Sequence, residues 1–404
     1  MADMLSSMFN RYTPITSFCP SLSGIEKHVI KWLCETVGYS NTTDSGGILV
    51  SGGSTANFMS VLCSRHIKLK EPENYHKGLV YCSDQTHHSF LRGCYLGGIP
   101  KKNIRLLSTS IQSNFDIDFI ELERQIAKDI ESNAGMPFLL VCNVGTTNTG
   151  KIERVEEYIR IAKKYDLWLH ADGCYGCCFT LLNDYKLKYF QHMGEFDSIA
   201  VDPHKGFFIG YGLGAFLIKK WKDEWTTFSF RTDDIAYYPS SSEHTDNLLS
   251  DKLLSDMFDM GIENSKDYKA LKLWLPLQIV GVKTFQNYLE EKLSLSDYLL
   301  EKLKKIEHLE VISNSLTITN FRYFNSKGSS MEELNKINKE LLLNFNSNGK
   351  VVISQTYLRD NGCETLMYVC RICILCVRTH QEQIDELIKN IRASVEFITK
   401  KYFL

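Results

Sequence analysis

The sequence lacks the features that mark membrane-spanning, secreted and nucleic-acid-binding proteins. No segment approaches the run of about 18 uninterrupted apolar residues that a membrane-spanning helix needs. The N-terminal stretch MADMLSSMFNRYTP has neither the basic start nor the long apolar core of a signal peptide. The formal net charge is −2 and the pI about 6.6, so neither nucleic acid nor an anionic membrane surface is an expected partner.

The sequence also contains no internal repeat and no low-complexity linker. With 404 residues, 44% of them hydrophobic and 23% charged, it predicts one large domain plus a smaller one, or two of similar size. The 13 cysteines are odd in number and scattered. Several, such as Cys142 in FLLVCNVG, lie in apparent strands or helices, which is typical of reduced, buried thiols in a cytoplasmic protein.

One group of cysteines has a spacing that can ligate an iron–sulfur cluster, namely Cys370, Cys373 and Cys376. The surrounding YVCRICILCV has the pattern of a β-strand, in which residues three apart face opposite sides. Neither a following Cys-Pro nor a loop-forming glycine accompanies the group. We therefore interpret these residues as strand cysteines and expect no metal site.

Short apolar runs alternate with helical patterns from about residue 47 to residue 290. Residues 20–37 are also helix-like, with apolar positions three and four apart. Such alternation predicts a mainly parallel sheet covered by helices on both faces, with ligands at the carboxyl ends of the strands. The expected strands are 78–83, 138–145, 167–173, 198–203 and 214–219, and the expected helices are 56–68, 118–132 and 154–165.

The C-terminal part mixes strands and helices in a different order. A long helical stretch over about 266–306 leads into two strand-like segments, 308–315 and 317–324. A further helix, two more strands and a final helix follow, which predicts a separate α+β domain of about 100 residues. The preceding segment 231–265 is polar and weakly patterned, and we interpret it as a mobile loop over a site or as a surface excursion.

Four segments carry polar residues where a strand ends or a helix begins. Gly53, Ser54 and Thr55 precede a helix, so backbone N–H groups and hydroxyls there form a ready site for a phosphate, although a simple helix cap is equally consistent. His87 follows one strand, and a lone histidine there is often structural. The other two segments are His170-Ala-Asp172 and Asp202-Pro-His204-Lys205.

These residues suit two chemistries. In a metal site, two histidines and two aspartates would be ligands, but the lysine and the glycine–serine turn would then have no role. Pyridoxal phosphate (PLP) uses every part: the turn binds its phosphate, Lys205 forms the Schiff base, and Asp172 keeps the pyridine nitrogen protonated. His87 would be the flat partner of the ring. A lysine among apolar neighbours such as Val201 and Phe207 is expected to be buried, which fits a covalent role.

With these segments in view, the chain resembles the group II PLP-dependent amino acid decarboxylases, the family of aromatic amino acid and glutamate decarboxylases. The resemblance implies an α/β fold, the PLP-dependent transferase fold type I, with a large domain on a mainly parallel seven-stranded sheet and a small C-terminal α+β domain. It also implies a homodimer with sites at the subunit interface. The matching segments, in the family's order, are SGGSTAN, SDQTHHSF, NVGTTNTG, HADGCYG, DSIAVDPHKG, YGLGAFLIKK, ALKLWLPLQIVG and CRICILCVRT.

The resemblance assigns roles position by position. Lys205 is similar to the Schiff-base lysine, His204 to its neighbour, Asp172 to the pyridinium partner and His87 to the histidine stacked on the ring. Catalytic roles are therefore expected for Lys205, His87 and His204. The remaining expected cofactor contacts are Gly53, Ser54 and Thr55 in the phosphate turn, Ser198 and Asp202 beside it, Thr147 in the GTT segment, and Cys174 under the ring, where the family usually has alanine.

One departure bears on the outcome of the reaction. The family often has a catalytic tyrosine after an aspartate in a mobile loop, and here Met260 follows Asp259 at about that place. Methionine cannot donate a proton, so another group such as His87, Tyr237 or Tyr238 would do so, or the product would change. Loss of that tyrosine in the family is associated with decarboxylation coupled to oxidative deamination, which gives an aldehyde.

A second departure is at the front of the chain, which begins near where the family's N-terminal arm ends. We expect a truncated N-terminal helical segment over 1–45, a large PLP-binding domain over 46–274, and a small domain with its bridging helix over 275–404. The expected function is PLP-dependent decarboxylation of an L-amino acid, with the aromatic amino acids as candidate substrates. The alternatives are an aldehyde-forming PLP enzyme and a catalytically weak truncated paralogue.

Overall fold

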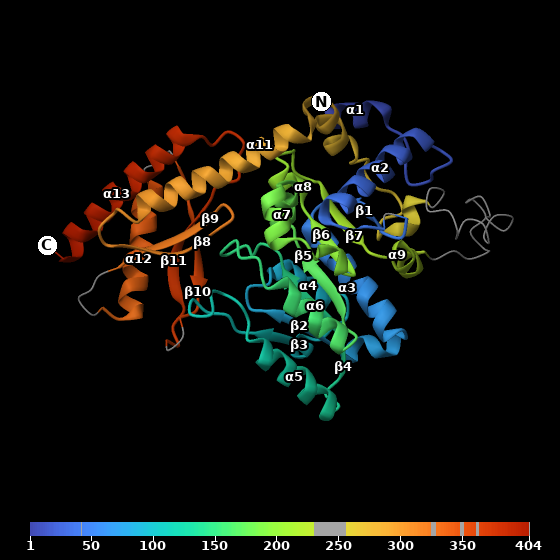
Figure 1. The fold of residues 1–404 in the computed structure, drawn as a ribbon, viewed down its shortest axis with the longest axis horizontal. Helices are drawn as coiled ribbons and strands as arrows, with labels where there is room; N and C mark the ends of the chain where they lie inside the picture. Colours follow the sequence, from blue (N-terminus) through green and yellow to red (C-terminus); the bar gives the residue numbers. More distant parts are fainter. Residues whose placement is uncertain (42, 230–255, 325–328, 348–350, 361–362, 404) are drawn as a thin grey trace.

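The computed structural model describes residues 1–41, 43–229, 256–324, 329–347, 351–360 and 363–403. Two bodies of unequal size are joined by one long helix, α11 (Figure 1). The helices are α1 (Ala2–Phe9), α2 (Pro20–Val37), α3 (Gly53–Leu69), α4 (His88–Leu96), α5 (Phe119–Glu131), α6 (Val155–Lys164), α7 (Asn183–Tyr189), α8 (Pro203–Gly206), α9 (Trp221–Phe228), α11 (Leu271–Leu303), α12 (Met331–Ser347) and α13 (Gln381–Phe403).

The larger body is built on a seven-stranded sheet in the order β1-β7-β6-β5-β4-β2-β3. Strand β7 is antiparallel to both of its neighbours, and the pairs from β6 through β5, β4 and β2 to β3 are parallel. This confirms the mainly parallel sheet. The strands are β1 (Gly46–Val50), β2 (Gly78–Ser83), β3 (Ile104–Leu107), β4 (Met136–Asn143), β5 (Trp168–Asp172), β6 (Ser198–Val201) and β7 (Gly214–Ile218).

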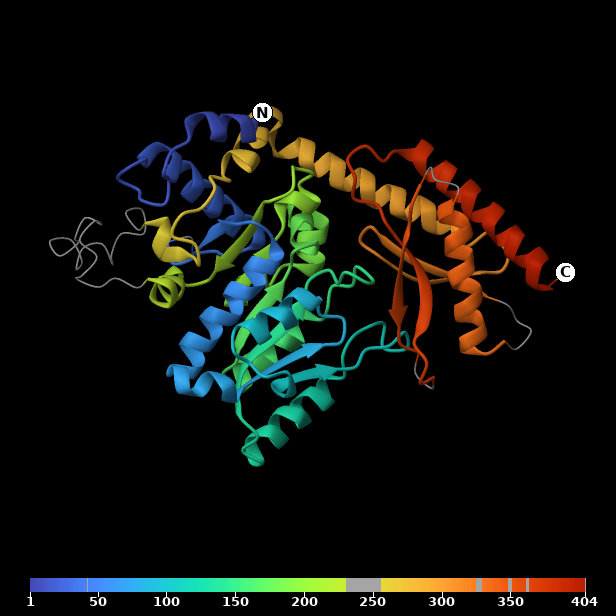
Figure 2. The same ribbon diagram turned by 180° about the vertical axis from the view of Figure 1, so that it is seen from behind.

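Alternate residues of each strand enter different hydrophobic cores, so both faces of the sheet are covered. In β4, Leu140 and Cys142 join the core formed with α2, α5 and α6, whereas Leu139 and Val141 join the core formed with α3 and α4. In the reverse view of Figure 2, α3 lies in front of the large sheet. Residues at the carboxyl ends of the strands therefore meet at one edge, between two packed helical layers.

The smaller body contains an antiparallel four-stranded sheet in the order β10-β11-β9-β8. Its strands are β8 (Leu309–Ser315), β9 (Ile318–Tyr323), β10 (Ser354–Leu358) and β11 (Met367–Cys373), and α12 and α13 share their core. The α+β character of the C-terminal part is thereby confirmed. Strand β11 contains Cys370 and Cys373, as the strand interpretation predicted, and ends before Cys376.

Helix α11 departs from the continuous helix expected over 266–306. It begins at Leu271, and Gly281 interrupts it with non-helical dihedral angles (φ 74°, ψ 161°), a left-handed conformation that glycine adopts without steric cost. Phe285 and Leu289 pack in the core of the large sheet, whereas Leu299 and Leu303 pack in the small core. The helix thus changes partners along its length.

We propose the domain boundaries that the sequence suggested, with a large domain over 46–274 and a small domain over 275–404. In support, the large sheet lies within 46–218 and the small sheet within 309–373. The segment 1–45 contains α1, which buries no side chain, and α2, which packs against the large core. In the described part of the chain, no helix combines the length and apolar character required to cross a membrane.

Candidate active site

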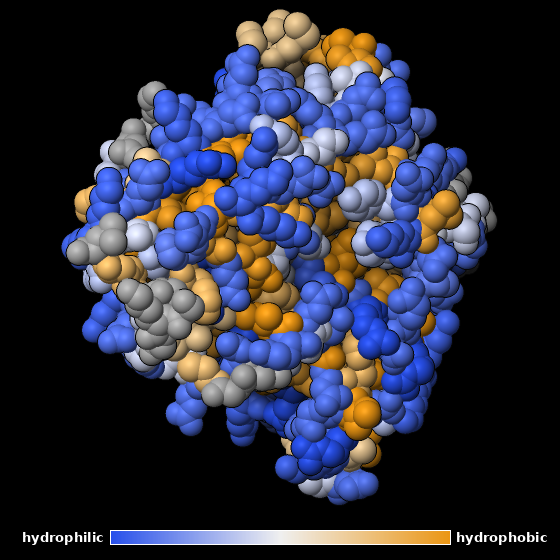
Figure 3. All heavy atoms as spheres, turned by 60° about the vertical axis from the view of Figure 1, so that its left-hand side comes forward, coloured by the Kyte–Doolittle hydropathy of each residue, from blue (hydrophilic) through white to orange (hydrophobic). Residues whose placement is uncertain are grey.

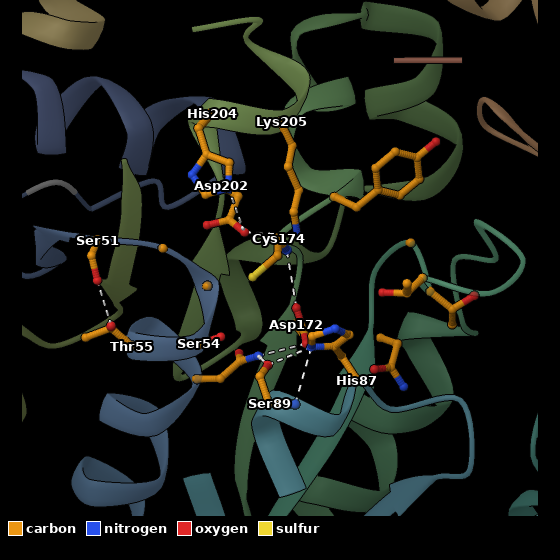
Figure 4. A pocket seen from close by; sticks show the side chains of 18 residues that line it. Ser51, Ser54, Thr55, His87, Ser89, Asp172, Cys174, Asp202, His204 and Lys205 are labelled. Atoms are coloured by element: carbon orange, nitrogen blue, oxygen red, sulfur yellow. Dashed lines mark hydrogen bonds and ion pairs between the residues drawn. The ribbon is translucent and has the colours of Figure 1, made fainter. Parts of the chain in front are cut away.

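A cavity of about 440 Å³ lies at the carboxyl ends of β1, β2, β4, β5 and β6, a size typical of small-ligand sites (Figure 4). The fold brings together here nearly all the residues singled out from the sequence. The cavity is lined by Ser51, Gly52, Gly53, Ser54, Thr55, Asn57, His87, Ser89, Asn143, Gly145, Thr146, Thr147, Asp172, Cys174, Tyr175, Asp202, His204 and Lys205.

The turn from β1 into α3 forms one wall. Helix α3 begins at Gly53, so the first N–H groups of its backbone have no acceptor within the helix. Because this end of the helix lines the cavity, these N–H groups are available to a ligand there. A Cβ added at Gly53 would lie 2.3 Å from Cys174 Sγ and 2.8 Å from an Asp202 carboxylate oxygen. Only glycine therefore lets this backbone approach the opposite wall, and the hydroxyls of Ser54 and Thr55 line the same turn.

Lys205 reaches into the cavity from the short helix α8. Its Nζ lies 3.0 Å from Asp202 Oδ2, and its side chain is 37% exposed. The expectation of a buried lysine is thus wrong, because the side chain crosses open cavity space although Val201 and Phe207 beside it are buried. Burial alone lowers the pKa of the Lys205 amine, but the Asp202 carboxylate, which attracts the charged amine and accepts a hydrogen bond from it, outweighs burial and raises that pKa above the ordinary lysine value.

Asp202 and His204 flank this lysine. His204 Nδ1 lies 2.7 Å from the carbonyl oxygen of Leu213 and donates to it, and its Nε2 lies 3.7 Å from Asp202 Oδ2. Asp202 is almost fully buried, and its Oδ1 has no hydrogen-bond partner among the described residues. A buried carboxylate oxygen without a partner is costly, so it marks a place where a ligand would supply a donor.

Asp172 is the last residue of β5, and its carboxylate lines the cavity and accepts two hydrogen bonds. Its Oδ2 accepts a hydrogen bond of 2.9 Å from Asn57 Nδ2, and its Oδ1 accepts one of 3.3 Å from the backbone N–H of Cys174. These two donors fix the orientation of the Asp172 carboxylate. Cys174 itself remains a neutral thiol, because burial raises the pKa of its sulfur well above the usual value.

His87 caps the N-terminus of α4 and lies beside Asp172 in the cavity wall (Figure 4). Its Nδ1 accepts from the backbone N–H of Ser89 at 3.3 Å and lies 2.7 Å from the Ser89 hydroxyl. Burial lowers the pKa of the His87 ring below its ordinary value, so the ring is neutral at neutral pH and carries its proton on Nε2.

Thr147 also lines the cavity, and its carbonyl oxygen accepts a hydrogen bond of 2.7 Å from Arg371 Nε. Arg371 belongs to β11, so the small domain reaches the wall of the cavity in the large one. The sequence did not single out this arginine, nor Asn57, Ser89, Asn143 and Tyr175. Asn143 ends the apolar strand β4 and Tyr175 lies shortly after β5, which is a usable signal, whereas Asn57 and Ser89 lie within helices.

Ser198 is the one expected cofactor contact that does not line the cavity. It begins β6, at the amino end of the strand and away from the edge where the cavity lies. Its hydroxyl is fully buried and bonds to Trp168 Nε1 and His170 Nδ1, each at 2.9 Å. The assignment of Ser198 beside the phosphate turn is therefore wrong for this chain, since a strand of four residues separates the two ends.

The loop expected over the site lies mostly outside the described residues, as do Tyr237 and Tyr238. Met260 is described and ends a short 3-10 helix, Met257–Met260. It is buried in the core on the α3 side of the sheet and does not line the cavity of its own chain. Asp259, just before it, accepts a hydrogen bond from the Ser229 hydroxyl at 3.0 Å.

The residues present fit PLP. The glycine turn at the start of α3 offers free backbone N–H groups to a phosphate, and the hydroxyls of Ser54 and Thr55 line the same turn. Lys205 supplies an amine inside the cavity, and Asp172 supplies a carboxylate opposite the space in which a ring would lie. Together these groups provide a site for each polar part of the cofactor.

Comparison with known proteins agrees with this chemistry. The family profile described as "Pyridoxal-dependent decarboxylase conserved domain" matches residues 1–324. The chain is 30% identical over 403 residues to an aromatic-L-amino-acid decarboxylase of Bacillus atrophaeus, covering 100% of this chain and 79% of that protein. It is 24% identical over 412 residues to a phenylacetaldehyde synthase of Arabidopsis thaliana, and this match covers 99% of this chain and 80% of that protein.

The fold is shared with solved members of this group. The structure of Catharanthus roseus tryptophan decarboxylase in complex with L-tryptophan matches with a TM-score of 0.85 at 22% identity, covering 98% of this chain and 80% of that one. The likeness extends over both domains. The chain therefore belongs to the group II PLP-dependent decarboxylases, and it is a PLP-dependent amino acid carboxy-lyase of fold type I.

Proposed function

We propose that the chain decarboxylates an L-aromatic amino acid, with PLP held covalently by Lys205. The observation that carries this proposal is the position of Lys205 Nζ inside the cavity, between the buried Asp202 and the wall that presents Asp172. The aromatic specificity is supported by the relatives, among them the aromatic-L-amino-acid decarboxylase of Bacillus atrophaeus and a tyrosine decarboxylase of Arabidopsis thaliana.

PLP supplies an electron-accepting ring that stabilises the electron pair left on Cα when CO2 departs. The residues of this chain hold that ring and its protons. Asp172, oriented by its two donors, would hold the proton of the ring nitrogen, and the turn at Gly53 and Ser54 would bind the phosphate. His87 would cover one face of the ring, and the proton on its Nε2 makes it the candidate donor to Cα.

An aldehyde-forming reaction is the second candidate, and Met260 is the observation that favours it. A thioether cannot donate the proton that leads to the amine, and Met260, at about the place where the resemblance expects a catalytic tyrosine, is buried in the core. The phenylacetaldehyde synthase of Arabidopsis thaliana is one of the relatives. This outcome consumes O2 and water and releases aldehyde, CO2, ammonia and hydrogen peroxide, whereas simple decarboxylation releases amine and CO2 alone.

We expect the PLP-loaded protein to release CO2 from L-tryptophan, L-tyrosine or L-phenylalanine and to leave L-glutamate unchanged. CO2, amine, aldehyde and dissolved O2 are measured in the same reactions. Amine without O2 uptake supports simple decarboxylation, and aldehyde with matching O2 uptake supports the second candidate. Turnover of L-glutamate alone would contradict the aromatic specificity, and no CO2 from any L-amino acid would favour a catalytically weak paralogue.

We propose further that the chain acts as a homodimer. Tyr211 is 84% exposed although its ring packs on His204, a cavity residue, with the ring centroids 5.1 Å apart. Ile279 and Val280 of α11 are 65% and 48% exposed. Figure 3 shows one face of the molecule on which apolar side chains are exposed in several patches between hydrophilic residues. Exposed apolar surface of this kind is typical of a subunit interface.

The mass in solution tests the dimer. We expect about twice the chain mass of 46.4 kDa by light scattering. The double change Ile279→Asp with Val280→Asp should shift the mass towards one chain, because two charges would be buried at the contact. Leu343→Asp, at a 71% exposed position of α12, is the matched control and should leave the mass unchanged. A parent protein of single-chain mass would contradict the proposal.

A further inference from the structure

We propose that Asn57 is the positioning residue of the cofactor site, and that one buried amide orients both the ring partner Asp172 and the stacking residue His87. This inference rests on the proposed function, in which these two residues contact PLP. Asn57 lies in the first turns of α3, is 1% exposed and borders the cavity. None of the roles assigned from the sequence uses it.

Three contacts determine the orientation of the amide. Nδ2 donates to Asp172 Oδ2 at 2.9 Å and to the Ser89 hydroxyl at 3.4 Å, and Oδ1 lies 3.0 Å from His170 Nε2. Reversing the amide would place its carbonyl oxygen against the Asp172 carboxylate, with no hydrogen between two acceptors. The charge on Asp172 therefore requires Nδ2 to face it, and Oδ1 is left to accept from His170.

This requirement fixes the tautomer of His170. Its Nε2 must carry the proton that Asn57 Oδ1 accepts, so its Nδ1 is left to accept from the Ser198 hydroxyl at 2.9 Å. Nδ1 also lies 3.2 Å from the carbonyl oxygen of Ser198, a longer contact that would hold a hydrogen bond only in the opposite tautomer. Ser198 in turn accepts from Trp168 Nε1 at 2.9 Å. Burial lowers the pKa of His170 to about 4, so the ring is neutral at neutral pH and its two nitrogens keep distinct roles.

The result is a series of hydrogen bonds in which each residue donates to the next, in the order Trp168, Ser198, His170, Asn57 and Asp172. Every member is buried, so no water competes for these bonds. A branch leaves Asn57 through the Ser89 hydroxyl, which donates to His87 Nδ1 at 2.7 Å. Asn57 therefore orients both the ring partner Asp172 and the stacking residue His87. Ser198 acts on the site only through His170, which explains why it is buried and hydrogen-bonded at a distance from the cavity.

The first experiment reads the tautomer of His170 directly, without reference to turnover. The full chain, loaded with PLP and labelled with 15N in its histidines, is studied by NMR, and His170→Gln identifies the His170 signals by their loss. We expect a neutral ring with the proton on Nε2. A proton on Nδ1, or a charged ring at pH 7, would overturn the proposal even if Lys205 and Asp172 behave as proposed.

The second experiment separates positioning from a general structural role. In Asn57→Leu we expect the visible absorption of protein-bound PLP to persist and kcat to fall about 10- to 100-fold with a smaller change in KM, since one hydrogen bond to a charged group is lost. Ser64→Ala is the matched control, because Ser64 is a buried hydroxyl on the same helix that bonds only to Val61 in the described contacts. Its kcat should equal that of the parent.

A double change decides whether His170 acts through Asn57. If it does, His170→Phe combined with Asn57→Leu lowers kcat no further than Asn57→Leu alone, because both changes remove the same orientation of one amide. Losses that multiply would overturn the series. If instead the spectrum with PLP is unchanged in Lys205→Ala, the proposed function fails, and the NMR tautomer still decides whether this arrangement of donors exists.

Discussion

Replacing Lys205 with alanine is expected to remove both the visible absorption band of the PLP-loaded protein and at least about a thousandfold of its turnover. The Lys205 amine is the candidate that lies inside the cavity and can bond to the aldehyde of PLP. The pH dependence should show the raised pKa of this amine, because its proton must leave before the bond forms. Covalent capture of PLP should therefore become faster as the pH rises.

The matched control for this change is Lys219→Ala. The Lys219 side chain is 39% exposed and lies 3.6 Å from Glu195, so it resembles Lys205 in exposure and in having a carboxylate partner, but it lies outside the cavity. Its spectrum and turnover should equal those of the parent. A Lys205→Ala protein that keeps the band and the activity would remove the central assignment, whereas a parent protein without any band would show that this site does not capture PLP.

Apolar runs were sufficient to predict the interior of the large sheet but not its edges. Strands β2, β4, β5, β6 and β7 were expected, since each is a short apolar run that is buried on both faces. The edge strands β1 and β3 were not. In β1, two glycines replace the usual β-branched residues, and Gly47 is required because a Cβ there would lie 2.1 Å from the carbonyl oxygen of Phe216. In β3, three of the four residues are partly or fully exposed.

The positions of the site residues were predictable for a different reason. Residues that end parallel strands must meet at one edge of the sheet, so His87, Asp172 and Lys205 could be brought together from chain order alone. Ser198 was assigned from the resemblance, and the position of strand ends argues against it, because it lies at the beginning of its strand rather than its end. The exposure of Lys205 was also misjudged, since its neighbours in the sequence are buried and only the cavity makes the lysine accessible.

The support for Asp172 was not accessible from the sequence. The apolar residues of α3 do not all mark its buried face, since Phe58 and Leu62 are only partly buried. Asn57 is buried among the neighbouring positions of the helix, where it meets Asp172, 115 residues further along the chain. The sequence does not indicate which distant residue a polar side chain within an amphipathic helix will contact. The contact between Asn57 and Asp172 follows only from the packing of α3 across β5.

Asp172→Ala is expected to lower kcat by about a thousandfold, which corresponds to roughly 4 kcal/mol of lost transition-state stabilisation. The physical reason is that the ring nitrogen loses the carboxylate that keeps it protonated, so the ring accepts electrons poorly. The affinity for PLP should fall less, because the turn at Gly53 and the amine of Lys205 remain. The measurements are kcat, KM and a spectroscopic titration with PLP.

Asp197→Asn is a suitable control for the loss of a charge. Asp197 precedes the neighbouring strand β6, and its carboxylate accepts from the backbone N–H of Leu169 at 2.8 Å, outside the cavity. We expect its kcat to remain within about threefold of the parent, because the effects of most surface and near-surface changes on folding do not reach the site. An equal loss in both variants would indicate that the effect of Asp172→Ala is structural.

A chemical rescue then separates the charge on the ring from every other role of Asp172. N-methyl-PLP carries a permanent positive charge on its ring nitrogen and needs no carboxylate to keep it. The space left by Asp172→Ala accepts the added methyl group, so this cofactor should restore much of kcat in the variant. In the parent protein the same cofactor should bind poorly, because the methyl group would meet the carboxylate that Asn57 and Cys174 hold in place. If N-methyl-PLP restores nothing although it binds, then Asp172 does not act through the ring nitrogen, and the carboxylate would instead have to be assigned to the orientation of His87.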